Sequence, residues 1–187
     1  MASIGHVAVG MAAARWFTPE GRGVLGAMIG FSALSMLPDL DVVGFRFGVA
    51  YGAPFGHRGA SHSLVVAAVL GFAAGAVGYA RSGGEERGAR AVRLGLWVAG
   101  VVASHGLLDA MTDGGKGVAL LWPFTRERFF FPWRPIPVAP IGAGFLSMRG
   151  MRVAAVELFE FAPLFAYGVW GRGGRWAGTR TGADRSR

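Results

Sequence analysis

Two long apolar segments constrain the fold of this chain more than any other feature. Residues 60–80 contain one histidine and no charged side chain, and residues 94–111 are uncharged until His105 and Asp109 at their end. Each has about the 20 residues that a helix needs to cross the hydrocarbon core of a bilayer. Composition agrees, because 52% of the residues are hydrophobic and 16% are charged, compared with about 25% charged in soluble domains. We therefore predict an all-α integral membrane protein.

Three further apolar segments complete a predicted bundle of about five helices. Two of them, at about 15 residues, are shorter than a usual membrane span, and the third carries two glutamates. The bundle forms one membrane-embedded domain over residues 1–170, with a polar connector, two loops and a basic tail that we expect to be disordered. The two short helices are residues 1–17 and 23–37, and the last helix is residues 153–170. The first loop is residues 39–59, the polar connector residues 81–93, the aromatic and Pro-rich loop residues 114–149, and the tail residues 171–187.

The number of segments predicts where the chemistry lies. If all five cross the membrane, every histidine and every candidate carboxylate falls on or near the same side. Eleven of the 19 Lys and Arg residues lie on the opposite side and eight on the side of the histidines. The positive-inside rule then favours a cytoplasmic tail and a site that faces outward. The net charge of +8 is explained by topology and anionic headgroups, and we expect no nucleic-acid partner.

A stripe of ionisable side chains closes the second long apolar segment. His105, Asp109 and Asp113 are spaced i, i+4 and i+8, which stacks all three on one face if the helix continues that far. An imidazole and two carboxylates at the end of an apolar helix are costly unless a cation compensates them. A divalent metal ion is the commonest such cation.

Two shorter motifs add candidate ligands. Asp39 and Asp41 occur in Pro-Asp-Leu-Asp, and His57 and His62 flank Arg58 in Gly-His-Arg-Gly-Ala-Ser-His-Ser. Imidazole and carboxylate suit zinc, manganese or iron, and the chain has no cysteine. The ligands suffice for two ions, which can clamp the attacking and leaving oxygens of a phosphoester. Each motif has a simpler interpretation: a packed or capping histidine, a helix stop, or a carboxylate on a proton path.

Other residues have predicted roles around this site. Four arginines can hold an anionic substrate group or contact headgroups: Arg58, Arg126, Arg128 and Arg134. Three serines are expected to be caps or to orient the histidines: Ser61, Ser63 and Ser104. We expect Glu157 to face the bundle, as a ligand or in a salt bridge with Arg152 or Arg58, and Glu160 to be interfacial. Residues 129–133, Phe-Phe-Phe-Pro-Trp, are expected to anchor the chain in the membrane interface.

Taken together, these motifs resemble a known family. Gly-His near the N-terminus, Pro-Asp-Leu-Asp, His-Arg-Gly-x-x-His-Ser and Ser-His-x-x-x-Asp, in this order over residues 1–165, are similar to the bacterial membrane-bound metal-dependent hydrolases, the inner-membrane group described as LexA-regulated. The His-x-x-x-Asp element is also remotely similar to one in zinc-dependent phospholipases C. The resemblance implies six metal ligands: His6, Asp39, His57, His62, His105 and Asp109. It also makes Asp41 and Asp113 ligands or supporting residues and places Arg58 against the substrate.

We therefore expect a multi-pass protein of the bacterial inner membrane that hydrolyses a phosphoester of a lipid or lipid-linked headgroup. A metal-activated water would attack, with Asp41 or Asp113 as general base and one to three divalent ions, most simply zinc. A cation or proton transporter and a metal-binding protein without turnover are the alternatives.

Overall fold

The computed structural model describes residues 3–18 and 23–171, and within these ranges every regular element is a helix. The α-helices are α1 (Ser3–Phe17), α2 (Val24–Met36), α3 (Leu64–Arg81), α4 (Arg87–Ala110), α5 (Met148–Glu160) and α6 (Ala162–Trp170). The 3₁₀-helices are η1 (Leu37–Phe47), η2 (Ala60–His62) and η3 (Gly142–Leu146). The predicted all-α bundle is confirmed.

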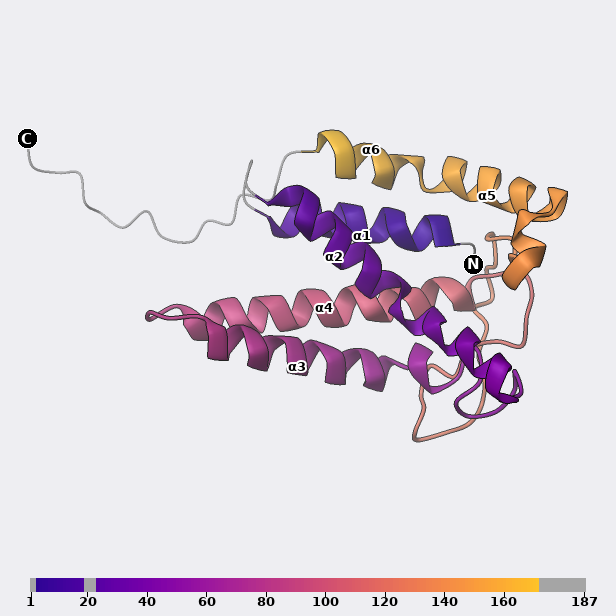
Figure 1. The fold of residues 1–187 in the computed structure, drawn as a ribbon, viewed down its shortest axis with the longest axis horizontal. Coiled ribbons are helices and arrows are strands. Elements are labelled where there is room, and N and C mark those ends of the chain that lie inside the picture. Colours follow the sequence, from indigo (N-terminus) through magenta and orange to yellow (C-terminus); the bar gives the residue numbers. More distant parts are fainter. Residues whose placement is uncertain (1–2, 19–22, 172–187) are drawn as a thin grey trace, which may run out of the picture.

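The helices run side by side and divide the molecule into two ends (Figure 1). The α3–α4 turn, the start of α2 and the end of α6 lie at one end. The start of α1, η1, η2 and the long loop between α4 and α5 lie at the other end. All four histidines belong to this second end, as the segment count predicted, and we call it the site end.

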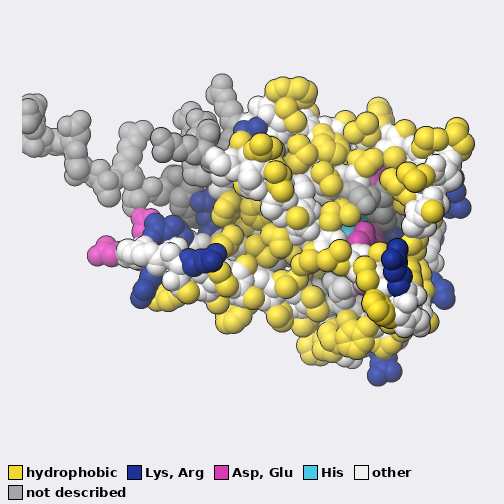
Figure 2. Space-filling view, viewed as in Figure 1, with side chains coloured by type: hydrophobic (Ala, Val, Ile, Leu, Met, Phe, Trp, Pro, Cys, Tyr) yellow, Lys and Arg dark blue, Asp and Glu magenta, His cyan; other side chains and the backbone are white. Residues whose placement is uncertain are grey.

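Three helical segments are long and apolar enough to cross a membrane. They are α2 together with η1 (Val24–Phe47), α3 and α4, and the pair α5–α6 is a fourth if its 59° bend is allowed within one span. Large apolar side chains on them are exposed, such as Phe72 of α3 at 80% and Leu96 of α4 at 70%, and hydrophobic side chains cover much of the visible flank (Figure 2). Helix α1, with 15 residues, is shorter than a usual span.

Close backbone contact joins the central helices. A Cβ atom on Gly71 of α3 would lie 2.5 Å from the carbonyl oxygen of Gly95 on α4, so only glycine lets these backbones approach so closely. Beyond this contact, Ala67 of α3 packs with Val98 and Val102 of α4 in the apolar core. Small residues therefore set the spacing of the hairpin that carries His105 and Asp109.

Several predicted boundaries were wrong. Helix α4 starts at Arg87, inside the predicted connector, and the predicted loop over residues 39–59 is helical to Phe47. The predicted last helix is two helices, because Pro163 in the first turn of α6 cannot continue the hydrogen-bond ladder of α5. Phe129 packs against the buried Val118 rather than serving only as a membrane anchor, whereas Trp133 is 69% exposed. The predicted disordered tail lies, after Gly171, outside the described residues.

Candidate metal centre

Three separate stretches of chain deliver the ionisable side chains to the site end. Pro38 stands in the first turn of η1, which continues α2 and carries Asp39 and Asp41. The turn before η2 and η2 itself supply His57 and His62, and α4 supplies His105 and Asp109 one helical turn apart.

Four ligand atoms meet in one place. Nε2 of His105 lies 3.1 Å from Nε2 of His62 and 3.2 Å from Oδ1 of Asp39. Nε2 of His62 lies 3.5 Å from both Asp39 Oδ1 and Asp109 Oδ2, and Nε2 of His105 lies 3.9 Å from Asp109 Oδ2. Zinc bonds of about 2.0–2.2 Å place tetrahedral ligand atoms about 3.3–3.6 Å apart. These four side chains, which we call the four-ligand cluster, therefore have spacings close to those of a tetrahedral site.

The outer nitrogens of the two imidazoles fix which nitrogen faces the centre. Nδ1 of His105 lies 2.6 Å from the carbonyl oxygen of Ser35, which can only accept, so Nδ1 carries the proton. Nδ1 of His62 lies 3.2 Å from Oδ2 of Asp41 and 3.0 Å from Oγ of Ser61, and in the tautomer that donates to Asp41 its proton is on Nδ1. In the neutral rings both Nε2 atoms then present lone pairs to each other at 3.1 Å. A proton on one ring or a metal ion between the rings satisfies such a pair, and carboxylate or carbonyl partners on the outer nitrogens are typical of metal-binding histidines.

The net negative charge of the cluster also favours a bound cation. The carboxylates of Asp39, Asp41 and Asp109, together with the guanidinium of Arg58, carry a formal net charge of −2 around the neutral histidines. Burial on its own lowers the pKa of His62, but hydrogen bonds to Asp109, Asp39 and Asp41 outweigh it and raise the pKa to about 10. The same negative charge that holds a proton on this ring suits a divalent ion, so the residues fit the metal that the sequence predicted.

Asp41 and His57 form a second group beside the cluster. Oδ1 of Asp41 lies 2.7 Å from Nδ1 of His57, and Oδ2 accepts hydrogen bonds from Ser61 Oγ at 2.7 Å and from the backbone N–H of Arg58 at 3.2 Å. Asp41 thereby holds both His57 and His62. Its oxygens are already occupied by donors, which places it as an orienting residue more readily than as a base.

His6 lies behind the cluster, on α1. Its ring stacks on that of His105 with centroids 3.6 Å apart, it is fully buried, and Nε2 lies 3.7 Å from Oδ1 of Asp109. Neither ring nitrogen has a hydrogen-bond partner. His6 is therefore close enough to share Asp109 with the cluster, although it is outside the group of four ligand atoms.

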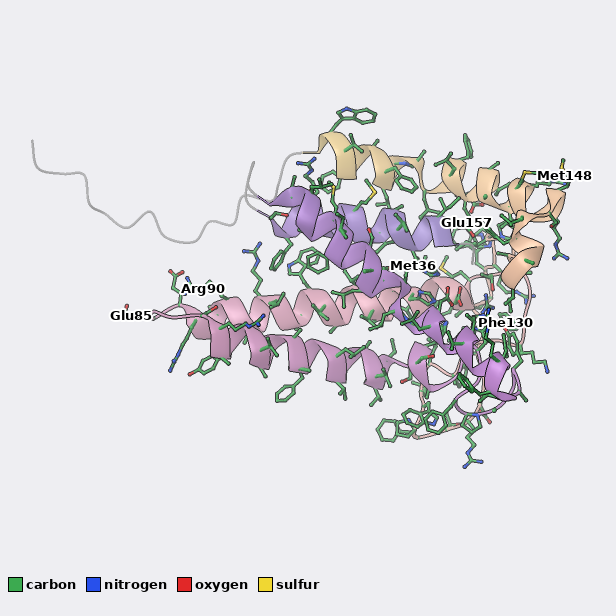
Figure 3. The ribbon with its side chains drawn as sticks, viewed as in Figure 1. Met36, Glu85, Arg90, Phe130, Met148 and Glu157 are labelled. Carbon is green, nitrogen blue, oxygen red and sulfur yellow. The ribbon has the colours of Figure 1, made fainter. Side chains whose placement is uncertain are left out.

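Glu157 is buried on α5, as predicted. Its Oε2 accepts a hydrogen bond of 3.1 Å from the backbone N–H of Gly5, next to His6. Figure 3 shows Glu157 between α5 and the start of α1. A carboxylate at a helix N-terminus is favourable, and this one fixes the turn of α1 that carries His6. Glu160 is exposed, as expected of an interfacial residue.

Arg58 is held rigidly at the edge of the cluster. It is 1% exposed, its Nε lies 3.0 Å from Asp109 Oδ2, and its Nη1 donates to Thr112 Oγ1 and to the carbonyl oxygen of Gly114. Its backbone φ of 61° is rare for a residue with a side chain. Strained backbone of this kind is kept where the surrounding structure fixes a functional side chain.

Some predicted site residues lie elsewhere. Helix α4 ends at Ala110, so Asp113 leaves the predicted stripe; it is exposed, and its Oδ1 accepts a hydrogen bond from the backbone N–H of Val138. Arg134 lies over the ring of Phe130, and Arg126 is exposed. The guanidinium of Arg128 donates to four backbone carbonyl oxygens, so it braces loops instead of facing the cluster.

The serines mostly have the predicted supporting roles. Ser63 caps α3 by accepting a hydrogen bond from the N–H of Val66, and Ser61 binds Asp41. Ser104 instead donates to the carbonyl oxygen of Val101 within α4. Two supporting groups were missed, the Ser35 carbonyl and the Thr112 hydroxyl. Only the Thr112-Asp113-Gly114 turn signal gave any hint of the second.

A cavity of about 350 Å³ reaches the cluster. Asp39, His57 and Arg58 form its polar part. The remaining lining is mostly apolar and comes from η1 and from residues 138–145. A small ligand in this cavity would therefore contact the edge of the four-ligand cluster and an apolar wall at the same time.

An apolar helical bundle with a buried histidine and carboxylate centre at one end defines a membrane protein with a candidate metal site. The chain belongs to the YdjM inner membrane protein family, whose model matches residues 1–176. It is 50% identical over 128 residues to "Inner membrane protein YbcI" of Escherichia coli (strain K12), and the alignment covers 67% of this chain and 70% of that protein. No solved structure matches the chain. The family and the relative support the predicted inner-membrane location, and both names describe a place rather than a reaction.

Proposed function

We propose that this protein is a metal-dependent hydrolase that cleaves a phosphoester of a lipid or lipid-linked headgroup. One observation carries the proposal: the Nε2 atoms of His62 and His105 lie 3.1 Å apart with carboxylate oxygens of Asp39 and Asp109 beside them, at spacings that suit a single divalent ion. A divalent ion between these side chains would bind all four groups at once, whereas a proton on one imidazole would serve only part of the cluster.

The ion would be held by Asp39, His62, His105 and Asp109. When bound, such an ion lowers the pKa of water towards neutrality and polarises a phosphoryl oxygen. Four protein ligands close a tetrahedral shell, so activation of a water would require a fifth position on the ion; zinc, manganese and iron all accept these nitrogen and oxygen donors.

The chain's own residues supply binding and proton transfer. Arg58 lines the cavity and is fixed by Thr112 and Gly114, so its guanidinium can orient an anionic phosphoester. His57 also lines the cavity, and Asp41 binds its Nδ1, which leaves Nε2 to take or give a proton. In this proposal His57 transfers the proton, and Asp41 orients the imidazole of His57. Asp113 accepts a hydrogen bond from the backbone N–H of Val138, and it thereby holds the loop between α4 and α5.

Elemental analysis combined with an activity assay tests this function. Purified protein should contain stoichiometric zinc, manganese or iron and should release phosphate or a headgroup from phospholipids in mixed micelles. His105→Ala should lower both the metal content and the activity, while Glu85→Ala, at the opposite end of the bundle (Figure 3), should change neither. Metal without turnover of any phosphoester would favour a non-catalytic metal protein, and metal-dependent ion flux into vesicles would favour a transporter. Absence of bound metal would refute the proposal.

The proposed orientation places the site end outside the cytoplasm, following the Lys and Arg asymmetry. A topology reporter fused after Arg187 should then report a cytoplasmic C-terminus. A reporter active in the periplasm would reverse this placement without affecting the metal site.

A further inference from the structure

The cavity beside the cluster has two chemically different parts. Asp39, His57 and Arg58 lie at one part, next to the candidate metal. Apart from Tyr51, the rest is mostly apolar, with Met36, Leu40 and Val42 from α2 and η1, and Val138, Ile141 and Phe145 from the segment that precedes α5. A fully polar substrate would leave these apolar walls without a partner, whereas an amphiphile satisfies both parts.

The end of the bundle beside the cavity is covered by braced loops. Nη1 of Arg128 donates to the carbonyl oxygens of His57 and Gly117 at 3.0 and 3.4 Å. Its Nη2 donates to those of Tyr51 and Ala53 at 3.1 and 3.3 Å. One guanidinium thus ties residues 51–57 to residue 117.

Backbone hydrogen bonds join the same loops to the metal-binding stretch. The N–H of Ala119 donates to the carbonyl oxygen of Arg58, and that of Leu64 to the carbonyl oxygen of Leu120, both at 3.0 Å. His57, Arg58 and His62 are at most 7% exposed beneath this cover. Access from water along the bundle axis is therefore restricted.

The flank of the bundle is different. Figure 2 views the molecule across its helix axes, and acidic and histidine side chains are visible on that flank among hydrophobic side chains, with a Lys or Arg side chain close by. Leu40 of the cavity wall is 62% exposed. Exposed apolar side chains on the flank of a membrane protein are suited to contact with lipid.

We propose that this cavity binds a membrane lipid that enters sideways from the bilayer. The phosphate of the lipid lies against Arg58 and the four-ligand cluster. Its acyl chains extend out of the cavity between η1 and residues 138–145. The inference deepens the proposed function and rests on it for the phosphoester. It adds that the substrate carries its own hydrocarbon chain and that a water-soluble headgroup alone is not a substrate.

A matched pair of adjacent valines tests the site. Val42 lines the cavity, while Val43 is 49% exposed and lies outside the lining. Val42→Trp should fill the cavity, and Val43→Trp should add the same ring to the outer surface of the same helix. Both variants are compared with the full-length, zinc-loaded wild-type protein, and their circular dichroism and zinc content report whether each folds.

The probe is phosphatidic acid with a diazirine on one acyl chain, at trace level in nanodiscs of phosphatidylethanolamine and phosphatidylglycerol. Photolysis should place adducts in residues 36–42 and 138–145, and unlabelled phosphatidic acid should compete for them while inorganic phosphate and glycerol phosphate should not. Val42→Trp should lower the yield of these adducts by about tenfold, and Val43→Trp should leave it unchanged.

The outcomes separate the two proposals. Equal labelling of both variants, labelling confined to exposed surfaces such as that around Phe72, or competition by glycerol phosphate would each overturn the lipid site. If the adducts appear as expected but no phosphoester is cleaved, the lipid site stands and the hydrolase proposal fails. If Val42→Trp misfolds, Val42→Phe provides a smaller filling residue, and competition by unlabelled phosphatidic acid remains decisive in the wild-type protein.

Discussion

Replacement of Asp41 by asparagine should weaken metal binding although Asp41 is not one of the four ligands. Its two carboxylate oxygens serve four donors: Nδ1 of His57 at 2.7 Å, Nδ1 of His62 at 3.2 Å, Oγ of Ser61 at 2.7 Å and the N–H of Arg58 at 3.2 Å. Asparagine keeps the shape but exchanges one oxygen for an NH₂ group, which cannot accept a hydrogen bond. In either orientation of the amide, the donors that bind the replaced oxygen in the wild-type protein lose their acceptor.

The effect on the metal passes through His62. Without a carboxylate on Nδ1, the tautomer that carries its proton on Nε2 becomes more populated, and that tautomer has no lone pair for the ion. Loss of such an outer partner typically costs about 10–100-fold in metal affinity, or about 1.4–2.7 kcal/mol. Because His62 is the one ligand of the four that Asp41 holds, we expect a loss within this range, and the change at His57 should affect turnover rather than metal affinity.

Asp113→Asn is the matched control, since Asp113 is the other carboxylate that the sequence proposed as a base. Asp113 is exposed and makes one hydrogen bond to the N–H of Val138, which asparagine can keep. Its metal affinity should stay within about 0.5 kcal/mol of wild type. Competition titration of zinc against a chromophoric chelator in detergent measures both variants. Wild-type affinity in Asp41→Asn, or an equal loss in Asp113→Asn, would refute the reasoning.

Three further predictions follow from the packing around the site. Gly106→Ala should reduce zinc affinity by about tenfold or more, because its Cβ would lie 2.3 Å from the carbonyl oxygen of His62; Gly100→Ala, which meets open space, should not. Glu157→Ala should lower the unfolding free energy by about 1–3 kcal/mol through loss of the acceptor for the N–H of Gly5, measured by thermal unfolding in detergent, and Glu157→Gln should restore most of it. Removal of the metal by a chelator should lower the melting temperature, with about 2.7 kcal/mol of stabilisation lost if the ion was at 100 times its dissociation constant; an unchanged melting temperature would show that no ion was bound.

Much of the fold could be predicted because both the lipid-facing and the core positions of a membrane helix are apolar. The apolar composition of residues 60–80 and 94–111 was therefore enough to predict α3 and α4, and Ser63 is the N-cap of α3. Helix ends were less predictable. Arg87, Arg90 and Arg93 look like a solvated connector, yet they form the first turns of α4, since a helix that leaves the membrane gains charged side chains without losing its hydrogen bonds.

The candidate site was predictable where helical spacing governs it. His105 and Asp109 are one turn apart on α4 and do meet. Extension of the same spacing to Asp113 was wrong, because Thr112 Oγ1 bonds back to the carbonyl oxygen of Asp109 and the glycines after it turn the chain away. The turn signal in Thr-Asp-Gly-Gly outweighs the i, i+8 pattern.

The partners that orient the ligands could not have been predicted. The carbonyl oxygen of Ser35, which fixes the tautomer of His105, has no side-chain signature, and it reaches His105 only because α2 crosses α4 at that point. Arg128 resembles an anion-binding residue in the sequence, yet four carbonyl oxygens from separate loop positions take up its donors. Such contacts depend on tertiary structure, which a single sequence does not encode locally.

The position of the cluster explains how an apolar protein tolerates so many ionisable groups. Buried carboxylates are costly in a membrane protein, and here each one that faces the cluster is met by an imidazole, by Arg58 or by a hydroxyl. The loops that Arg128 braces lie over His57 and Arg58, while apolar side chains of η1 and residues 138–145 form much of the cavity wall. A fully polar substrate would leave these apolar walls without a partner. The arrangement of charge, cover and cavity therefore fits a reaction on a molecule that already lies in the membrane.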